Sequence, residues 1–224
     1  MALARYKDLC IDVSDARAAG EYWSTMLGWS LQMHDDGDAH LRDDAGRTQV
    51  WLNVVPEPKS VKNRLHIDVN AESVQRALDA GARLQEEYPR WTVLLDPDGQ
   101  EHCVFPRDQG FDKRPYELVW DCTAGTGSGD IAAWWCDVVG GAVVDDDGES
   151  AIQDIPECPW DYVVFGGVPE PKTTKNRLHI DVATDDLDAL VAHGATILRA
   201  KGDRGLGWTV LADPDGNEFC AFTD

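Results

Sequence analysis

The sequence predicts an α+β fold built from four strand–helix–strand–strand–strand (βαβββ) units in two tandem domains. Three observations lead to this class. The chain repeats itself once, strands of period two open each half of a repeat, and the same turn motif precedes the last strand of each repeat. A length of 224 residues is enough for two ordinary domains.

The internal repeat is visible in two blocks. Residues 55–69 (VPEPKSVKNRLHIDV) and 168–182 (VPEPKTTKNRLHIDV) are identical at 13 of 15 positions. Residues 91–105 (WTVLLDPDGQEHCVF) and 208–222 (WTVLADPDGNEFCAF) are identical at 11 of 15 positions. Two matches in the same order indicate a duplicated domain rather than chance similarity.

The boundary between the copies is expected near the polar, turn-prone stretch that follows Pro106. We therefore predict one domain over residues 1–110 and a second over residues 111–224, each containing two βαβββ units. The second copy is four residues longer between its two matching blocks. This insertion is expected in the glycine-rich loop at 201–207, since surface loops tolerate insertions.

The first unit opens with an alternating segment, Asp8–Val13, which predicts a half-buried strand. Its apolar side chains share one face of the strand and its polar side chains share the other. Ser14 or Asp15 is expected to cap a helix that runs to Leu27 and ends at Gly28. Two or three short strands should complete the unit.

The second unit repeats this order. Leu65–Val69 alternates like the first strand and places His66 and Asp68 on one face. A helix is expected across Val74 to Leu78, with Gly81 as its C-cap. The turn motif Asp-Pro-Asp-Gly should separate the last two strands. These later strands of the first copy are expected at 50–55, 91–95 and 101–105.

Composition narrows the class of function. There are 41 acidic and 20 basic residues, for a formal charge of −21, and such a field disfavours nucleic acid and anionic membranes as partners. No apolar run is long enough for a membrane span, and the start of the chain lacks the apolar segment of a signal peptide. We expect a cytoplasmic protein whose six cysteines, none in a C-x-x-C pair, are reduced thiols.

Three motifs carry a resemblance to a known superfamily. They are the Tyr-Trp-x-x-x-Leu-Gly-Trp helix pattern ending at Trp29, the segment Asn63–Asp68 and the segment Asp96–Glu101, and the second copy has equivalents of all three. The whole chain resembles the vicinal-oxygen-chelate superfamily of glyoxalases, bleomycin-resistance proteins and dioxygenases, in its glyoxalase-like branch. The resemblance implies mixed sheets that curl into cups, each holding a small ligand.

The resemblance also implies where a metal would bind, because metal-dependent members place ligands on the first and last strands of each unit. Carried over by position, the candidate positions are Asp8, about Leu52, His66, Cys103, about Glu117, Phe165, His179 and Cys220. The usual last-strand carboxylate is a cysteine in both copies. Glu101 and Glu218 lie two residues before these cysteines on the same strand face. One position in each copy is apolar.

Two interpretations of these positions stay open. In one, no cofactor binds, and His66 hydrogen-bonds Asp68 or a ligand while Cys103 packs as a small buried residue. In the other, each cup holds one divalent Zn, Fe, Ni or Mn ion through the His66–Cys103 and His179–Cys220 pairs, since imidazole and thiolate bind such ions. The carboxylates that could assist are Asp8, Glu101, Glu117 and Glu218. A cup can combine units of one copy or of different copies, so Asp8 can face either pair.

The function expected from these features is binding of a small hydrophobic or aromatic molecule in a cup without a complete metal site, by sequestration as in the bleomycin-resistance branch. The alternative is a metal-dependent lyase, isomerase or dioxygenase. The expected partner is a small molecule, and the protein is expected to be a monomer or a homodimer. The tryptophans that differ between the copies are the candidates for ligand stacking, namely Trp29, Trp51, Trp120 and Trp160.

The basic residues that precede the strand segments at 65–69 and 178–182 form a last group of candidates. Lys59, Lys62 and Arg64 recur in the second copy as Lys172, Lys175 and Arg177. They either neutralise an anionic ligand at the cup rim or anchor the linker between two units through ion pairs.

Overall fold

The computed structural model describes residues 2–123, 127–146 and 148–223. Within these residues the chain forms four βαβββ units, as the sequence predicts. Among the described helices, none is both long and apolar enough to cross a membrane.

The first copy contains the first two units. The first unit consists of β1 (Arg5–Val13), α1 (Ala16–Leu27), β2 (Ser30–Met33), β3 (Ala39–Arg42) and β4 (Thr48–Val54). The second unit consists of β5 (Leu65–Ala71), α2 (Val74–Asp79), β6 (Arg83–Glu87), β7 (Thr92–Leu95) and β8 (Glu101–Pro106).

The second copy repeats this order. The third unit consists of β9 (Pro115–Thr123), α3 (Ser128–Val139), β10 (Ala142–Asp146), β11 (Glu149–Gln153) and β12 (Tyr162–Val168). The fourth unit consists of β13 (Leu178–Ala183), α4 (Leu187–Ala192), β14 (Thr196–Arg199), the short helix η1 (Asp203–Gly205), β15 (Thr209–Ala212) and β16 (Glu218–Phe222). The short helix lies in the glycine-rich insertion.

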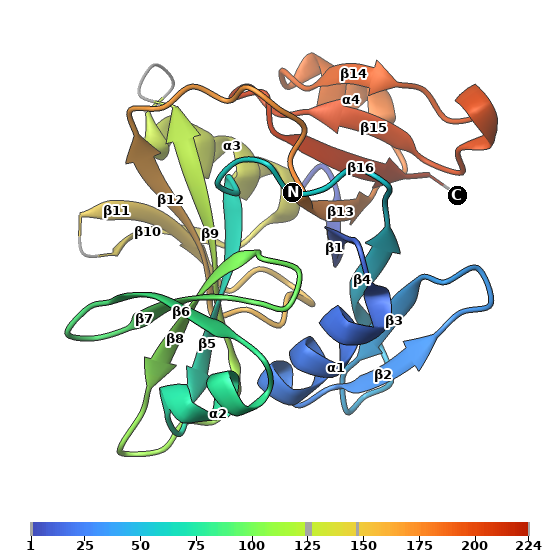
Figure 1. The fold of residues 1–224 in the computed structure, drawn as a ribbon. Helices are drawn as coiled ribbons and strands as arrows, with labels where there is room; N and C mark the ends of the chain where they lie inside the picture. Colours follow the sequence, from blue (N-terminus) through green and yellow to red (C-terminus); the bar gives the residue numbers. More distant parts are fainter. Residues whose placement is uncertain (1, 124–126, 147, 224) are drawn as a thin grey trace.

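The sixteen strands form two eight-stranded sheets, and each sheet combines units from both copies. One sheet has the order β14-β15-β16-β13-β1-β4-β3-β2, and we call it the terminal sheet because it joins the first and fourth units. The other has the order β10-β11-β12-β9-β5-β8-β7-β6, and we call it the central sheet. In Figure 1 the blue and red ends of the chain accordingly share one sheet, while green and yellow strands share the other.

The two copies meet at one antiparallel strand pair in each sheet. In the terminal sheet β1 pairs with β13, which places Cys10 opposite His179 and Asp8 opposite Asp181. In the central sheet β5 pairs with β9 in the same way. The pairing decides the question that the sequence left open, since Asp8 shares a sheet with His179 and not with His66.

Helix α1 shows how local sequence sets an element. The Asp15 carboxylate accepts hydrogen bonds from the backbone N–H groups of Arg17 and Ala18, which identifies Asp15 rather than Ser14 as the N-cap. Gly28 ends the helix with φ +76°, a left-handed conformation that glycine adopts without strain.

Helix α2 ends one residue earlier than predicted. Its C-cap is Ala80, whose N–H bonds to the carbonyl of Arg76, and Gly81 follows it with φ +109°. Gly81 therefore turns the chain just beyond the cap.

The core lies between the sheets and their helices. The alternation in β1 buries Leu9, Ile11 and Val13 completely in the core, as predicted. The prediction that the strand is only half-buried is wrong, because its polar face is also nearly inaccessible to solvent. Trp23 and Trp135 occupy equivalent buried positions on α1 and α3. Where the apolar face of a strand such as β3, β4 or β12 packs against a helix, its other face is left to line a cup.

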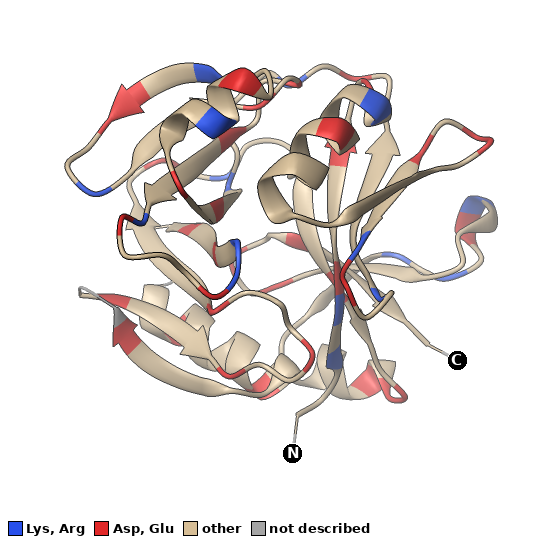
Figure 2. Ribbon diagram, turned by 90° about the horizontal axis from the view of Figure 1, so that it is seen from below, with Lys and Arg blue, Asp and Glu red and all other residues tan. Residues whose placement is uncertain are grey.

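The charges are spread over the molecule. Figure 2 shows acidic residues on loops, helices and strand ends from several elements, with fewer basic residues among them. Most of these carboxylates act as solvated surface groups, and only a few are buried in the sheets.

Candidate ligand-binding site

The terminal sheet carries a cavity of about 550 Å³ on its polar face, the face opposite the helices. A volume of this size is in the usual range for small-molecule pockets, about 300–1,000 Å³. The strands that supply its lining come from the first and fourth units, so neither copy forms it alone. We call this cavity the terminal cup.

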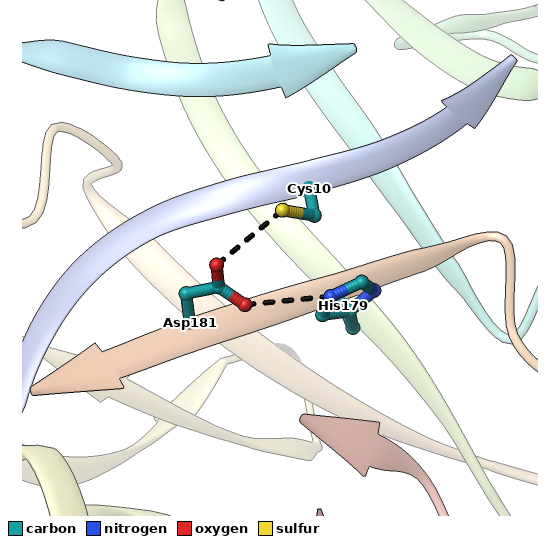
Figure 3. A group of neighbouring side chains, drawn as sticks. All are labelled: Cys10, His179 and Asp181. Carbon is teal, nitrogen blue, oxygen red and sulfur yellow. Dashed lines mark hydrogen bonds and ion pairs between the residues drawn. The ribbon is translucent and has the colours of Figure 1, made fainter. Parts of the chain in front are cut away.

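Cys10, His179 and Asp181 line the floor of the terminal cup (Figure 3). The Asp181 carboxylate lies between the other two side chains. One oxygen is 3.4 Å from the Cys10 sulfur, and the other is 3.3 Å from His179 Nε2. The Cys220 sulfur on β16 lies 3.4 Å from the same imidazole nitrogen. The floor is thus a continuous chain of thiol, carboxylate, imidazole and thiol groups.

Asp8 extends this chain on β1. Its carboxyl is almost fully buried and accepts hydrogen bonds from Lys7 Nζ at 2.6 Å and from Trp51 Nε1 at 3.1 Å. Burial, followed by repulsion from Asp181, raises the Asp8 pKa to about 7 although Lys7 acts in the opposite direction. Asp8 and Asp181 therefore form a buried carboxyl pair in which Asp8 keeps its proton to a higher pH than an exposed aspartate does.

The two thiols of the floor, Cys10 and Cys220, are nearly inaccessible to solvent. Burial, together with the charge of Asp181, raises the pKa of Cys10 and of Cys220 well above the ordinary thiol range. Neither cysteine has the lowered pKa that marks an activated nucleophile.

Aromatic side chains form the walls. Trp208 and Phe222 stack with ring centroids 5.4 Å apart, and Lys7 Nζ lies 4.2 Å from the centre of the Phe222 ring. Trp51 lines the cavity from β4 and stacks on His34 at 5.4 Å. The cup therefore combines a polar floor with flat apolar walls.

Of the four tryptophans that the sequence analysis named as stacking candidates, Trp51 lines this cavity. Trp120 is fully buried and stacks on Trp135 and Phe165 in the core. Trp29 and Trp160 are also buried and pack edge to face against each other. The proposed stacking role is therefore wrong for these three residues, whose rings are core packing.

The central sheet carries the corresponding residues of the other copy, and we call its polar face the central cup. His66 Nε2 lies 3.3 Å from Asp68, and donor atoms of His66, Asp68 and Cys103 all lie within 4.8 Å of one another. Burial lowers the His66 pKa, but Asp68 outweighs it and the pKa is raised overall. Glu117 lies directly opposite Asp68 in the strand pair, as Asp8 lies opposite Asp181.

The two cups differ, among other places, at two positions on strands β1 and β9. Lys7 and Tyr116 each occupy the extra residue of a β-bulge, and Cys10 corresponds to Val119, the residue opposite His66. The central cup has a row of aromatic contacts that joins Trp91, Phe105, Tyr116 and Tyr162. The terminal cup is therefore richer in thiol groups, and the central cup is richer in aromatic rings.

Glu101 and Glu218 are occupied by contacts to the linkers. Glu101 pairs with Lys59 at 2.7 Å and accepts the Asn63 backbone N–H, while Glu218 pairs with Lys172 at 2.8 Å and accepts that of Asn176. Glu218 also contributes to the lining of the terminal cup.

The other basic residues of the two triplets also make structural contacts. Lys62 pairs with Asp121 at 2.5 Å, Lys175 pairs with Asp12, and Arg177 pairs with Asp98 at 3.3 Å. Arg64 donates to the Glu170 carbonyl at 2.8 Å. The triplets thus anchor the linkers, the second of the two roles considered from the sequence.

The apolar positions expected near the metal ligands face the core. Leu52 and Phe165 are completely buried on the helix side of their strands. Their neighbours Trp51 and Val164 pair with Cys10 and Val119 and occupy the cup side instead. Of the positions that the resemblance indicates, Asp8, His179 and Cys220 therefore share the terminal cup with Trp51 in place of Leu52, and an indole is not a metal ligand.

Comparison with known proteins places this geometry in a family. A family model described as a glyoxalase-like domain matches the chain twice, over residues 8–105 and 117–222. The chain belongs to the glyoxalase-like family. Both copies are thus glyoxalase-like domains of the vicinal-oxygen-chelate superfamily, and no curated protein sequence gives a significant match.

Solved structures share the glyoxalase-like fold at low sequence identity. Glyoxalase I from Zea mays aligns with a TM-score of 0.67 at 13% identity, over 98% of this chain and 92% of that chain. A putative dioxygenase from Bacillus subtilis aligns with a TM-score of 0.64 at 10% identity, over 100% and 86%. The cppA protein from Streptococcus pneumoniae aligns with a TM-score of 0.52 at 10% identity, over 98% and 99%. At these identities the similarity concerns the fold alone.

Proposed function

We propose that this glyoxalase-like protein binds a small aromatic or otherwise apolar molecule in the terminal cup and sequesters it without transforming it. The observation that carries the proposal is the 550 Å³ cavity with aromatic walls and a polar floor. Pockets of this composition bind through the apolar walls and orient the ligand through a few polar groups.

The walls favour a flat ligand. Trp208, Phe222 and Trp51 offer ring surfaces to the cavity, and aromatic stacking adds about 0.5–1.5 kcal/mol beyond the burial of area. The floor offers carboxyl, imidazole and thiol groups as hydrogen-bond partners. The acidic charge of the whole chain favours neutral or cationic molecules over anions.

The chemistry of the floor supports binding rather than turnover. Both thiols are held protonated by burial, and the indole of Trp51 interrupts the family's set of four metal ligands. A reaction that needs an activated thiol or that complete ligand set has no support from these residues.

A second candidate function is a metal-dependent lyase, isomerase or dioxygenase. The observation that favours it is the close grouping of Cys10, His179 and Asp181, whose donor atoms all lie within 4.8 Å of one another. A metal bound there would supply Lewis-acid chemistry to a substrate in the cup. The protein's own side chains would hold the ion and present Asp8 as a nearby carboxyl group.

Fluorescence titration with the uncharged aromatic probe N-phenylnaphthylamine tests the first proposal. We expect saturable binding of one probe per chain, and Trp208→Ala should weaken it by about tenfold, since the lost stacking and burial correspond to about 1.4 kcal/mol. Trp91→Ala is the matched control, because Trp91 holds the equivalent position in the other copy.

Two results would overturn the proposal. One is the lack of saturable binding, and the other is weakening of probe binding by Trp91→Ala with no effect of Trp208→Ala.

A second experiment distinguishes sequestration from turnover. Natural products that displace the probe are incubated with the protein and recovered. Unchanged mass after incubation supports sequestration, whereas a changed mass supports the second candidate function.

A further inference from the structure

The two linkers that carry the basic triplets contact each other. The first linker joins β4 to β5 and the second joins β12 to β13, so each runs from one sheet to the other. Arg64 Nη1 donates to the Glu170 carbonyl at 2.8 Å, and Arg177 Nη1 donates to the Glu57 carbonyl at 2.8 Å. This reciprocal contact brings the basic residues of both copies to one place.

A cavity of about 160 Å³ lies at this contact, and we call it the linker cavity. It is smaller than the usual pocket for a drug-sized molecule, about 300–1,000 Å³, so it suits a small ion. Ser60 and Thr174 line it with hydroxyl groups. The charged residues of its lining are five basic ones, Lys59, Lys62, Arg64, Lys175 and Arg177, and two acidic ones, Asp12 and Glu57. The lining therefore carries three more positive than negative charges.

The arginine of the second linker is fully engaged. Arg177 Nε donates to the Asp12 carbonyl at 3.1 Å, and Nη1 donates to the Glu57 carbonyl. Its Nη2 donates to the Asp98 carboxylate at 3.3 Å. Every nitrogen of this guanidinium therefore has an acceptor in the protein.

The equivalent arginine of the first linker is engaged only in part. Arg64 Nη1 donates to the Glu170 carbonyl, but a carboxylate oxygen of Asp215 is 3.9 Å from Nη2, which is too far for a hydrogen bond. Within the described residues, Nε and Nη2 of Arg64 have no hydrogen-bond acceptor, although the side chain is only 10% exposed. Because a buried donor without an acceptor is costly, an anion in the linker cavity would stabilise Arg64 by supplying acceptors.

The ion pairs that anchor the linkers leave further donors for a ligand. Lys62 pairs with Asp121 and Lys175 pairs with Asp12, and the two lysine side chains are 62% and 55% exposed. An ammonium group has three N–H donors, and exposed ion pairs hold their partners weakly. Both lysines can therefore donate to an anion in the linker cavity while they stay near their carboxylates.

The negative charge of the whole chain does not exclude an anion here. Interactions between exposed charges are largely screened beyond about 8 Å at physiological salt, so the groups that line the cavity dominate. Of the two carboxylates in the lining, that of Asp12 is already paired with Lys175. The local excess of positive charge is thus felt by an ion inside the cavity.

We propose that the linker cavity binds one small tetrahedral oxyanion, either inorganic phosphate or the phosphoryl group of a small phosphomonoester. Arg64, Lys62 and Lys175 are its main partners, since guanidinium and ammonium groups form charge-assisted hydrogen bonds with phosphate oxygens. Asp12 and Lys175 also line the terminal cup, but the aromatic walls of that cup take no part in the anion site. The anion site is therefore independent of the proposed sequestration.

Isothermal titration calorimetry with inorganic phosphate, at constant ionic strength in sodium chloride, tests the site. We expect saturable binding of one phosphate per chain. Arg64→Gln should weaken it by about tenfold or more, the usual effect of losing a charge-assisted hydrogen bond. Lys62→Gln, at a more exposed position, should weaken it by about threefold. Glycerol 3-phosphate is the second probe: equal affinity assigns the site to the free ion, and tighter binding assigns it to a phosphoryl group.

Lys172→Gln is the matched control. It removes the same charge from the second linker, but Lys172 pairs with Glu218 and lies outside the lining of the linker cavity, so phosphate affinity should stay within about twofold. Circular dichroism and urea unfolding establish that each variant is folded, and Lys62→Gln still tests the site if Arg64→Gln does not fold.

Two results would overturn the anion site. One is the absence of saturable phosphate binding by the unmodified protein. The other is a loss of affinity in Lys172→Gln as large as that in Arg64→Gln, because it would indicate a general effect of charge. Trp208→Ala, the variant that tests sequestration, should leave phosphate binding unchanged, so failure of either proposal is recognised without the other.

Discussion

The buried hydrogen bond between Tyr22 and His102 gives a sharp test of how the two copies diverged. The Tyr22 hydroxyl lies 2.5 Å from His102 Nε2, and both side chains are nearly or fully inaccessible to solvent. The second copy has Trp134 and Phe219 at the equivalent positions, so the same place in the fold also accepts two aromatic rings that contact each other without a hydrogen bond between them.

The expected magnitudes follow from burial. Tyr22→Phe removes the hydroxyl and leaves the imidazole of His102, which is 0% exposed, without this partner in the core. The cost should be about 1–3 kcal/mol of unfolding free energy. His102→Phe should cost a similar amount, because it leaves the Tyr22 hydroxyl unpaired.

The double variant should behave differently. With both polar groups replaced by apolar rings, no buried donor or acceptor is left unpaired, so the combined loss should be smaller than the sum of the single losses by about 1–2 kcal/mol. Urea unfolding followed by tryptophan fluorescence measures all four proteins. Single losses that add to within about 0.5 kcal/mol would refute the reasoning, because they would mean that the two groups do not act as a pair.

Three further outcomes are expected. Burial raises the Asp96 pKa to about 6. Protonation of Asp96 therefore stabilises the folded state fully below about pH 4, and this contribution is lost as the pH rises through 6. In urea unfolding, the stability of the unmodified protein relative to Asp96→Asn should fall by about 1 kcal/mol between pH 5 and 7.5. Gly141→Ala should cost at least about 2 kcal/mol, because at φ +94° an added Cβ would lie 2.5 Å from a backbone oxygen, whereas Gly37→Ala meets no neighbouring atom and should cost less in the same assay. His66→Ala should change the urea unfolding free energy by about 1–2 kcal/mol through loss of its contact with Asp68, and failure to fold would contradict this.

The repeat, the four βαβββ units and the core faces could be predicted because they depend on local patterns. Alternation in β1 is enough to assign Leu9 to the core and Asp8 to the opposite face. A cap such as Asp15 is recognisable because carboxylates next to a helix start bond its free N–H groups.

The composition of the cups could not be predicted in the same way. The contact between Cys10 and Asp181 joins residues 171 positions apart, and the two copies offer nearly identical strands as partners. The assignment of the cup-facing residue on β4 also depends on register, since a shift of one residue exchanges Leu52 for Trp51. Cys10 was therefore not recognisable as a neighbour of His179 before the pairing was known.

The exchange of units between the sheets has a consequence for the history of the chain. Cut between residues 110 and 111, each fragment would hold two half-sheets of four strands, with an inner edge at β1 and β5 or at β9 and β13. Two copies of a single repeat with these strands could complete each other's edges in the same way, as a dimer with two identical cups at its interface. In a single chain the two cups need not be identical, and the difference between Cys10 and Val119 changes one cup without changing the other.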